Sequence, residues 1–446
     1  MRKLSLVMAC VLTLVLIVTA VACGGASPTA TKAPAATNTP APAATSAPAS
    51  ATPTRAPTST TAPTATTAAP PGVLKVGIVA AMTGPGASWG TAIFNTHKLV
   101  AERINAAGGV TVQGKKYMFE IVAGDDKYTA AEAVTVTRKL IFEDKVNFFS
   151  GTLASASLVA MGPITDENKI IHFSNSWADK NALEGRKYVY RMALTIPSLH
   201  RDPGNWKVYK DKYPTFKTVA GITTNDQSGW AGLQSVFDSA DAAGFTIAGA
   251  KLYERGTTDF KPLLTPLLVN NPDFLSLGSS PEGDIAVMIK QARELGYKGK
   301  FVGPNVDAST LGKVASKENM EGMLSYAPAL KGAATPPGVI QAMEAYNQKY
   351  GTTTSVAAIM WDSLYFLKKA VEDANSLDAD KIAAAIDSWG EFDTVFGKAR
   401  MGGKDYYGRK AQILAPQLIS EIQNGENVNI MLANPVEVPL PAKKWW

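Results

Sequence analysis

The side chains that could do chemistry begin at residues 86–90, Gly-Ala-Ser-Trp-Gly, which have the G-x-S-x-G spacing of serine hydrolases. In those enzymes the serine lies directly at a strand end, and a histidine further along the chain activates it. Here Pro85 and other loop residues separate Ser88 from the preceding apolar run, and all three histidines lie at or before position 200. We therefore expect no catalytic residue and no enzyme, with a secreted hydrolase acting through Ser88 as a remote alternative.

Cysteine and metal chemistry is equally sparse. The chain has two cysteines, Cys10 and Cys23, and Cys10 lies in an apolar N-terminal run. If that run is removed, Cys23 remains alone, so neither an internal disulfide nor a multi-cysteine metal site can form. The net charge of +6 is spread along the chain, without the basic stripe interleaved with aromatics that indicates nucleic-acid binding. We expect no cofactor, no metal and no nucleic-acid partner.

The N-terminus has the layout of a secretory signal peptide, because Arg2 and Lys3 precede an apolar run from Leu4 to Val21. The run closes on residues 20–23, Ala-Val-Ala-Cys, and resembles a bacterial lipobox, whose cysteine receives a diacylglycerol and becomes the new N-terminus; alanine replaces the more usual leucine at position 20. Residues 1–22 are thus a predicted lipoprotein signal peptide, and Cys23 is the predicted lipidation site on the outer face of a cell membrane. An uncleaved anchor is the alternative, because about 18 apolar residues can just span a bilayer.

Residues 23–71 form a second segment, which from Ala26 to Pro71 consists almost entirely of Ala, Thr, Pro and Ser. Without Leu, Ile, Val or aromatic side chains, such a stretch cannot bury a core. Its prolines favour extended conformations of about 3 Å per residue. The composition predicts a tether, or an O-glycosylated stalk, between the lipid and the folded body.

Residues 72–446 are long enough for two lobes. Apolar runs of strand length alternate here with segments of helical period, which predicts parallel sheets with right-handed crossovers and helices on both faces. The predicted fold class is α/β, with two doubly wound lobes. Ligands bind beyond the carboxyl ends of the strands in such sheets. The predicted strands are residues 74–80, 117–123, 146–150, 169–173, 219–223, 246–253, 274–277 and 300–302, and the main predicted helices are residues 92–106, 130–142, 230–243, 260–269 and 284–295.

The C-terminal part differs in kind. Residues 417–423 and 426–431 alternate apolar and polar side chains around Asn424-Gly425, a dipeptide suited to a tight type I′ turn. A terminal antiparallel ribbon is predicted there.

Short strings spread over the body resemble one family, the leucine/isoleucine/valine-binding type of periplasmic solute receptor, a type I periplasmic binding protein that serves ABC transporters. The resemblance implies two lobes joined by three hinge crossings, expected near Ile196, Pro328 and Tyr407. Lobe 1 then comprises residues 72–195 with 329–408, and lobe 2 comprises residues 196–328 with 409–446. The strings are Gly77 to Pro85, Ile104 to Val110, Asp125-Asp126, Arg138 to Leu140, Ser150-Gly151-Thr152, Tyr190-Arg191, Thr258 to Phe260, Gln291 to Arg293, Val302 to Pro304 and Glu321 to Met323.

The same resemblance implies ligand-binding positions. Trp89 matches an aromatic lid after the first strand, and Ser155, with Thr152, matches the donors that meet a ligand oxygen after the third strand. Backbone N–H groups at a helix start suit such an oxygen, because the helix dipole favours negative charge there. A surface-exposed Trp89 and a Ser155 that merely caps its helix are the alternatives.

Two positions depart from the amino-acid-binding pattern of the family. After the fourth strand, the family's threonine position falls on Ala178, and after Pro304 its ammonium-binding glutamate is replaced by Asn305. An amide offers no charge to a cation, although Asp307 is two residues away. The candidate ligand-binding residues are Trp89, Thr152, Ser155, Ser174, Asn175, Ser176, Trp177, Trp230, Ser280 and Asn305.

Three indoles, of Trp89, Trp177 and Trp230, lining one cleft would favour a flat or apolar ligand. Structural packing of Trp177 or Trp230 is the alternative. The resulting prediction is a monomeric, lipid-anchored extracytoplasmic receptor of an ABC importer of the branched-chain amino acid type. It would capture an amino acid, carboxylate, amide or aromatic compound and deliver it to the permease.

A sensory protein of the same fold is the second class of function that the sequence leaves open. A sensor would normally be fused to a second membrane-spanning segment, and no further apolar run of that length follows Val21. The pattern therefore favours transport over sensing.

Overall fold

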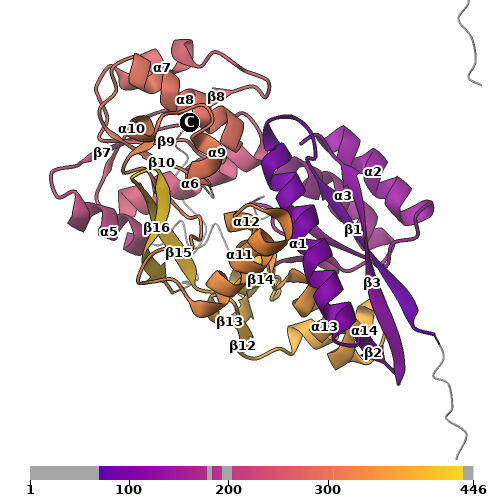
Figure 1. Cartoon of the computed structure of the whole chain (residues 1–446). Coiled ribbons are helices and arrows are strands. Elements are labelled where there is room, and N and C mark those ends of the chain that lie inside the picture. Colours follow the sequence, from indigo (N-terminus) through magenta and orange to yellow (C-terminus); the bar gives the residue numbers. More distant parts are fainter. Residues whose placement is uncertain (1–69, 178–182, 193–202, 305, 435–444, 446) are drawn as a thin grey trace, which may run out of the picture. The chain divides into compact units, whose positions relative to one another are not determined.

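The computed structural model describes residues 70–177, 183–192, 203–304, 306–434 and 445 (Figure 1). The predicted signal peptide, Cys23 and nearly all of the predicted tether lie outside these residues. Ala178, Ile196 and Asn305 also lie outside them.

The first sheet has nine strands in the order β12-β13-β14-β6-β5-β4-β1-β3-β2. β1 lies between β3 and β4 and pairs in parallel with both. Its side chains alternate between two cores, with Val76 and Ile78 on one face and Val79 on the other. Burial on both faces explains why this strand is a nearly continuous apolar run. The strands are β1 (Gly72–Ala80), β2 (Val110–Val112), β3 (Lys115–Asp125), β4 (Phe148–Thr152), β5 (His172–Ser174), β6 (Val189–Arg191), β12 (Phe392–Thr394), β13 (Gly397–Gly402) and β14 (Gln412–Leu414).

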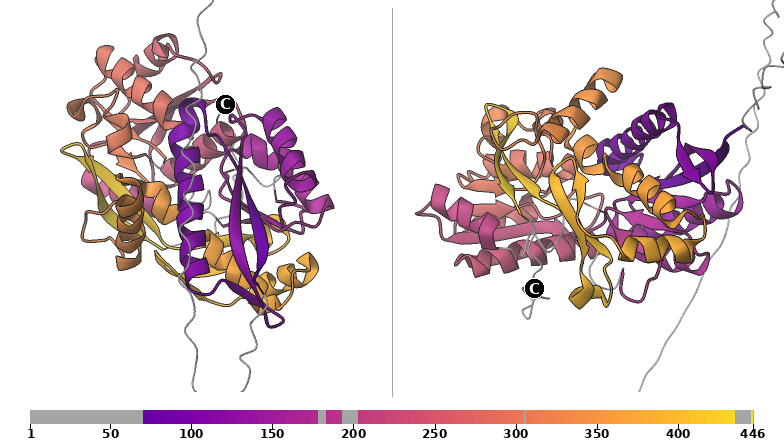
Figure 2. Two further views of the ribbon diagram at one scale, coloured as in Figure 1. Left: turned by 45° about the vertical axis from the view of Figure 1, so that its right-hand side comes forward. Right: turned by 90° about the horizontal axis from the view of Figure 1, so that it is seen from below.

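Helices cover both faces of this sheet (Figures 1 and 2). On one face, Ile93 of α1 joins Val76 and Ile78 in a core that also takes in residues of α11–α14. On the other face, Leu140 of α2 and Met161 of α3 pack with Val79. This is the doubly wound arrangement predicted from the sequence. The helices are α1 (Ala87–Ala106), α2 (Ala130–Phe142), α3 (Ser155–Glu167), α11 (Pro337–Tyr350), α12 (Ser355–Met360), α13 (Ser363–Ala374) and α14 (Ala379–Asp387), with the short α15 (Lys404–Tyr407) before β14.

The second sheet has seven strands in the order β16-β15-β11-β10-β9-β7-β8. One core joins Trp206 of α5 and Phe237 of α6 to Phe274, and the other joins Ile289 of α8 to Leu275. Helices therefore lie on both faces here as well. The strands are β7 (Thr218–Thr224), β8 (Thr246–Tyr253), β9 (Phe274–Ser276), β10 (Lys300–Val302), β11 (Leu324–Ser325), β15 (Gln417–Gln423) and β16 (Glu426–Ala433); the helices are α5 (Pro203–Lys212), α6 (Gln227–Ala242), α7 (Lys261–Leu268), α8 (Glu282–Glu294), α9 (Ala308–Leu311) and α10 (Lys317–Met320).

The chain passes between the two sheets three times, between β6 and β7, between β11 and the strand β12, and between β14 and β15. The family resemblance implied a third passage near Tyr407, but β14 still pairs in parallel with β6, so residues 409–414 belong with lobe 1. The passage falls at Ala415 and Pro416, where proline has no N–H to continue a ladder. The predicted limits at Ile196 and Pro328 stay predictions.

The terminal ribbon is present as predicted. β15 and β16 pair antiparallel, with Gln423 opposite Glu426. Asn424 and Gly425 both have positive φ, 54° and 79°, as a type I′ turn requires. Through β15 the ribbon joins the edge of the second sheet at β11.

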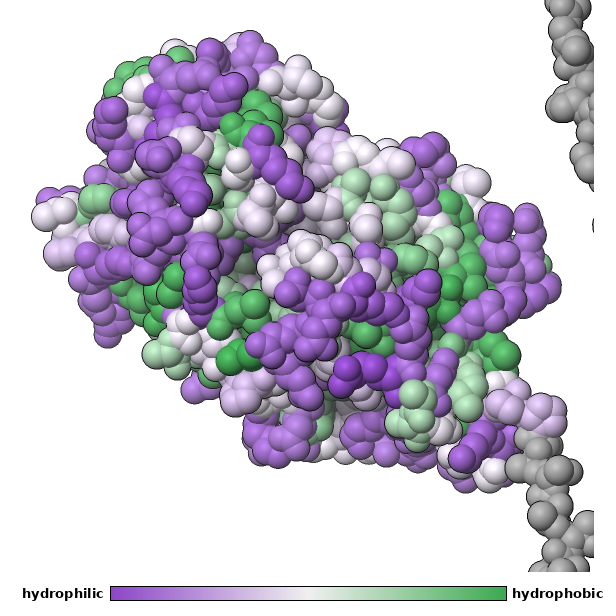
Figure 3. Space-filling model, viewed as in Figure 1, coloured by the Kyte–Doolittle hydropathy of each residue, from purple (hydrophilic) through white to green (hydrophobic). Residues whose placement is uncertain are grey.

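The face of the body seen in Figure 3 is mostly hydrophilic, with apolar side chains in small separate areas. Within the described part of the chain, no helix combines the length and apolarity needed to cross a membrane. The same residues contain no group of three or more His, Cys, Asp or Glu side chains arranged to hold a metal ion.

Candidate ligand-binding site

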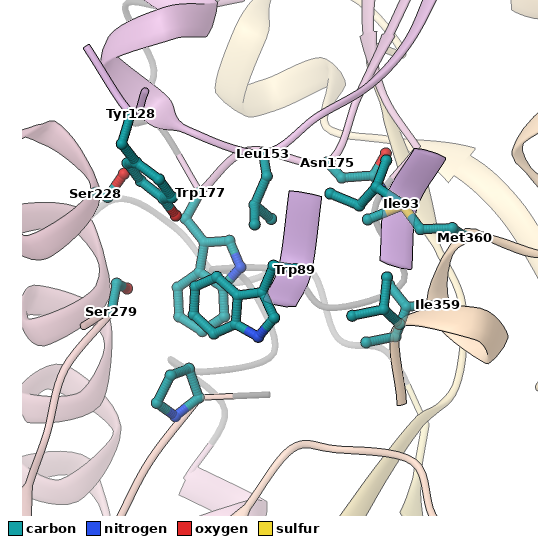
Figure 4. A pocket seen from close by; sticks show the side chains of 12 residues that line it. Trp89, Ile93, Tyr128, Leu153, Asn175, Trp177, Ser228, Ser279, Ile359 and Met360 are labelled. Atoms are coloured by element: carbon teal, nitrogen blue, oxygen red, sulfur yellow. The ribbon is translucent and has the colours of Figure 1, made fainter. Parts of the chain in front are cut away.

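A cavity with about 550 Å³ of empty space, its open mouth included, lies between the lobes (Figure 4). Most of its wall residues lie in the loops or helix starts that follow the carboxyl ends of parallel strands, which is where α/β sheets place their ligands. Lobe 1 also supplies one wall from α12. The lining residues are Trp89, Ile93, Tyr128, Leu153, Asn175, Trp177, Val356, Ile359 and Met360 of lobe 1 and Ser228, Ser279 and Pro304 of lobe 2.

Two indoles, of Trp89 and Trp177, form much of the apolar wall (Figure 4). Each is only 7% exposed, so Trp89 is not a surface tryptophan. Trp89 lies in the first turn of α1, and the neighbouring Gly90 lets that turn approach the end of β1, because a Cβ there would lie 1.8 Å from the carbonyl oxygen of Ala81. The glycine that seemed part of a hydrolase motif thus serves close packing.

Asn175 is the most buried polar side chain in the wall, at 1% exposure. Its backbone N–H donates to the carbonyl of Thr152 (2.8 Å), which fixes the residue against β4. Among the described residues, neither its amide oxygen nor its amide nitrogen has a hydrogen-bond partner. From lobe 2, Ser279 offers a buried hydroxyl that also lacks a partner.

The start of α3, where a ligand oxygen was expected, is occupied by protein. The N–H of Ser155 donates to the hydroxyl of Ser228 on α6 (3.1 Å), and the hydroxyl of Ser155 accepts from that of Ser176 (3.1 Å). The N-cap residue of α3 is Ala154, so Ser155 does not cap the helix by its side chain. The two helices therefore meet directly at this point across the lobes.

Other predicted residues lie behind the cavity wall or away from it. The hydroxyl of Thr152 is paired with Nε2 of His172 (2.9 Å), and Ser174 donates to the carbonyl of Thr152 (3.2 Å). Burial lowers the pKa of His172 to about 3, so this ring is neutral. Ser280 is fully buried but does not line the cavity.

Trp230 points elsewhere. It is 38% exposed, and its indole N–H donates to the amide oxygen of Asn225 (3.1 Å). The predicted cleft of three indoles is therefore a cavity with two, and Ser228, two residues earlier on α6, takes the position in the wall.

Two buried carboxyl groups of lobe 2 bridge to lobe 1 beside the cavity. Glu282 accepts from the hydroxyl of Ser88 (2.7 Å), and it also accepts from the backbone N–H of Asp307 (2.8 Å). Asp307 in turn accepts from the hydroxyl of Thr354 (2.9 Å) and the N–H of Ser355 (3.0 Å), at the start of α12. Burial raises the pKa of both acids, and the charge of Asp307 raises that of Glu282 further.

These contacts decide two questions that the sequence left open. The partner of Ser88 is a carboxyl group rather than a histidine, so the serine–histidine pair of the hydrolases that carry this motif is not formed at Ser88. Asp307 faces the lobe contact rather than the lining of the cavity between the indoles.

One basic group of lobe 2 packs against a wall residue and is already in an ion pair. Arg255 of lobe 2 lies over the ring of Tyr128 (4.0 Å to the ring centre) and forms an ion pair with Asp226 (2.5 Å). Among the described residues, no Lys, Arg, His, Asp or Glu side chain lines the cavity.

Two α/β lobes that are joined by three passages and enclose an apolar cavity define a class of protein, the hinged receptor that binds a small molecule between its lobes. The chain belongs to the periplasmic binding protein family, whose model matches residues 73–412.

Individual relatives agree with this assignment. A leucine-, isoleucine-, valine-, threonine- and alanine-binding protein of Pseudomonas aeruginosa is 26% identical over 317 residues, which are 70% of this chain and 82% of the relative. A leucine-binding protein of Thermotoga maritima superposes with a TM-score of 0.69 at 25% identity, covering 81% of this chain and 99% of that one. A solute-binding protein of Rhodopseudomonas palustris, solved with 3,4-dihydroxybenzoic acid, shares the fold with a TM-score of 0.68 at 22% identity, covering 82% and 99%.

Several wall residues could not be recognised as such from the sequence. Val356, Ile359 and Met360 lie on α12, which returns to lobe 1 after the chain has built most of lobe 2. The sequence pattern of an apolar helix face predicts only that the face is buried in the core. Local pattern therefore cannot show that the same side chains line a cavity.

Proposed function

We propose that this protein is the solute-binding receptor of an ABC importer, that it captures one small organic molecule between its lobes, and that it acts by binding rather than turnover. The observation that carries the proposal is the cavity. Its wall comes from both lobes and includes buried polar atoms that have no hydrogen-bond partner among the described residues. A site between two lobes with apolar walls and a few polar groups is typical of small-molecule binding.

Contacts across the cavity explain how binding would be coupled to closure. Ser155 with Ser228, Ser88 with Glu282, and Asp307 with Ser355 each join the lobes. A ligand touching both walls adds its own contacts to these, so it stabilises the closed arrangement over an open one. The permease would then receive the closed, loaded receptor.

The binding proposal is tested by screening amino acids, small carboxylates, aromatic acids and amides for a rise in melting temperature, because a ligand that binds only the folded state stabilises it. We expect at least one compound to raise the melting temperature of the wild type and to decrease its radius of gyration in solution scattering. A screen in which no compound distinguishes the wild type from Trp89→Ala would contradict the proposal.

We further propose that the receptor is exported, cleaved before Cys23 and held at the membrane by a lipid on that residue, with residues 23–71 as the tether. The sequence of residues 20–23 and the apolar run before it support this. Mass spectrometry of the N-terminal peptide should find a diacylglyceryl cysteine. Cys23→Ser should release the protein from membranes, whereas Cys10→Ser should leave it attached, and an intact Met1 on the membrane-bound protein would refute the anchor.

A further inference from the structure

Among the polar side chains of the cavity wall, Asn175 restricts most strongly which ligand can bind. Asn175 is 1% exposed and lines the cavity (Figure 4), and within the described part of the chain neither of its amide atoms has a partner. A buried amide without partners costs stability, because it has given up hydrogen bonds to water without replacing them. A ligand that hydrogen-bonds to this amide would recover that cost.

The donor and acceptor of the amide restrict which ligand group can hydrogen-bond to it. An asparagine side chain offers a carbonyl acceptor and an NH₂ donor side by side. Since both atoms lack partners, the conclusion is the same whichever way the amide is turned. The ligand group that pairs with both atoms of the Asn175 amide must present one donor beside one acceptor, as another amide does. A carboxylate presents only acceptors, so one of its oxygens would meet the carbonyl of Asn175 unfavourably.

The surroundings also disfavour a charged ligand. No charged side chain lines the cavity among the described residues, and Arg255 is held by Asp226 and Tyr128. The N–H of Ser155 is taken by Ser228. Transferring an unpaired charge into such a wall is costly, whereas the indoles of Trp89 and Trp177 favour a flat apolar body.

From these contacts we infer that the ligand is an uncharged compound with a flat, apolar body and an amide-type edge that pairs with Asn175. This inference rests on the proposed function and names the ligand class of the same site. The hydroxyl of Ser279 offers a second polar contact from lobe 2, on the other side of the indoles from Asn175 (Figure 4).

Matched pairs of compounds test the inference on the full chain in detergent. Benzamide and benzoate have nearly the same shape and differ in one NH₂ group and a charge, and isovaleramide and isovalerate form an aliphatic pair. Isothermal titration should give the amide of each pair an affinity at least about tenfold higher than that of its acid. An acid that binds as tightly as its amide overturns the inference, and so does leucine binding more tightly than both amides.

A variant separates ligand recognition from structure. Asn175→Leu keeps the size of the side chain and removes both polar atoms. It should lower benzamide affinity at least about tenfold while leaving the melting temperature of the unliganded protein unchanged or higher, since a buried unpartnered amide is lost. A lower melting temperature together with unchanged benzamide affinity overturns the inference.

Asn429 provides the matched control, because it is equally buried but fully paired. It donates to the carbonyl of Ala329 (2.7 Å) and the hydroxyl of Thr335 (2.7 Å), and it accepts from the N–H of Ala329 (3.0 Å). Asn429→Leu should lower the melting temperature and leave the preference for amide over acid intact. If Asn175→Leu fails to fold, the affinities of the wild type for each amide and its acid still test the inferred ligand class.

The result also separates this inference from the proposed function. If acids or leucine bind best and Trp89→Ala abolishes that binding, the receptor function stands and the ligand class is wrong. If Trp89→Ala changes the binding of no compound, both fail.

Discussion

At the scale of single residues, the two indoles and Asn175 form a wall whose members come from the ends of different strands. Trp89 follows β1, and Asn175 and Trp177 follow β5. The family resemblance pointed to these three residues, and each follows a strand that the sequence pattern predicts. Their role in binding stays a prediction.

Trp230 could not be placed in the same way. α6 begins at Gln227, three residues before the predicted start, and Ser228 and Trp230 lie about 200° apart around it. An error of a few residues in the predicted start of this helix is therefore enough to assign the wrong side chain to the cavity. Local pattern does not fix a helix start that closely.

The contrast between two tryptophans gives a residue-scale prediction. Trp89→Ala removes a buried wall of the cavity and should weaken binding of the best ligand about tenfold or more. Trp230→Ala removes an exposed indole paired with Asn225 and should leave the dissociation constant unchanged. Isothermal titration of both variants checks this, and equal losses in the two would contradict the assignment of the wall.

Glu282 gives a prediction for pH. Its pKa is raised above the ordinary 4.5 in the folded protein, by burial and then by the charge of Asp307. The folded state therefore holds a proton that the unfolded state releases, and the stability from Glu282 is present below pH 4.5 and falls as the pH rises above it. Glu282→Gln resembles the protonated acid.

The free energy of unfolding, from urea titrations across pH 4 to 9, should thus fall with pH more steeply in the wild type than in Glu282→Gln. Parallel pH profiles would show that this carboxyl group keeps its ordinary pKa. Comparing the two proteins at each pH cancels the contribution of His97 and His172, whose lowered pKa values act in the opposite direction.

At the scale of elements, α12 depends on the other lobe. Its first N–H groups are met by Thr354 from its own chain segment and by Asp307 from lobe 2, and its side chains form one wall of the cavity. A helix of six residues has few bonds of its own, so these caps matter to its position.

Removing the cap from lobe 2 should affect both stability and binding. Asp307→Ala should cost about 1–2 kcal/mol of unfolding free energy and also weaken ligand binding. Asp378→Ala removes a comparable cap, the carboxylate that accepts from the N–H of Lys381 at α14, which contributes nothing to the cavity wall. The control variant should lose stability of similar size and keep the wild-type dissociation constant; a matching loss of affinity there would mean that α12 is not specifically held by Asp307.

At the scale of the whole molecule, the alternation of strands and helices was sufficient to predict two doubly wound lobes. The terminal ribbon was predicted separately, from the apolar and polar alternation around Asn424-Gly425. The third passage was misplaced because β14 has only three residues and is separated from β15 by Ala415 and Pro416. Strand pairing between Gln412 and Arg191 joins residues far apart in sequence, and no local pattern reports it.

Ligand binding should leave a signature on both lobes. Hydrogen exchange should slow at residues 226–230 of lobe 2 and residues 354–360 of lobe 1, because the ligand lies between their elements. The ribbon formed by β15 and β16 contributes no wall residue and serves as the internal reference. Protection confined to one lobe would exclude a ligand held between them.

The division of the polar wall between Asn175 on one lobe and Ser279 on the other has a consequence for unloading. When the lobes separate, the two side chains move apart, so a bound molecule keeps at most one of them. The separation of the lobes that opens the cavity therefore also lowers its affinity for the ligand. A permease that prefers the open receptor would need no separate trigger, because pulling the lobes apart would itself turn a tight complex into a weak one.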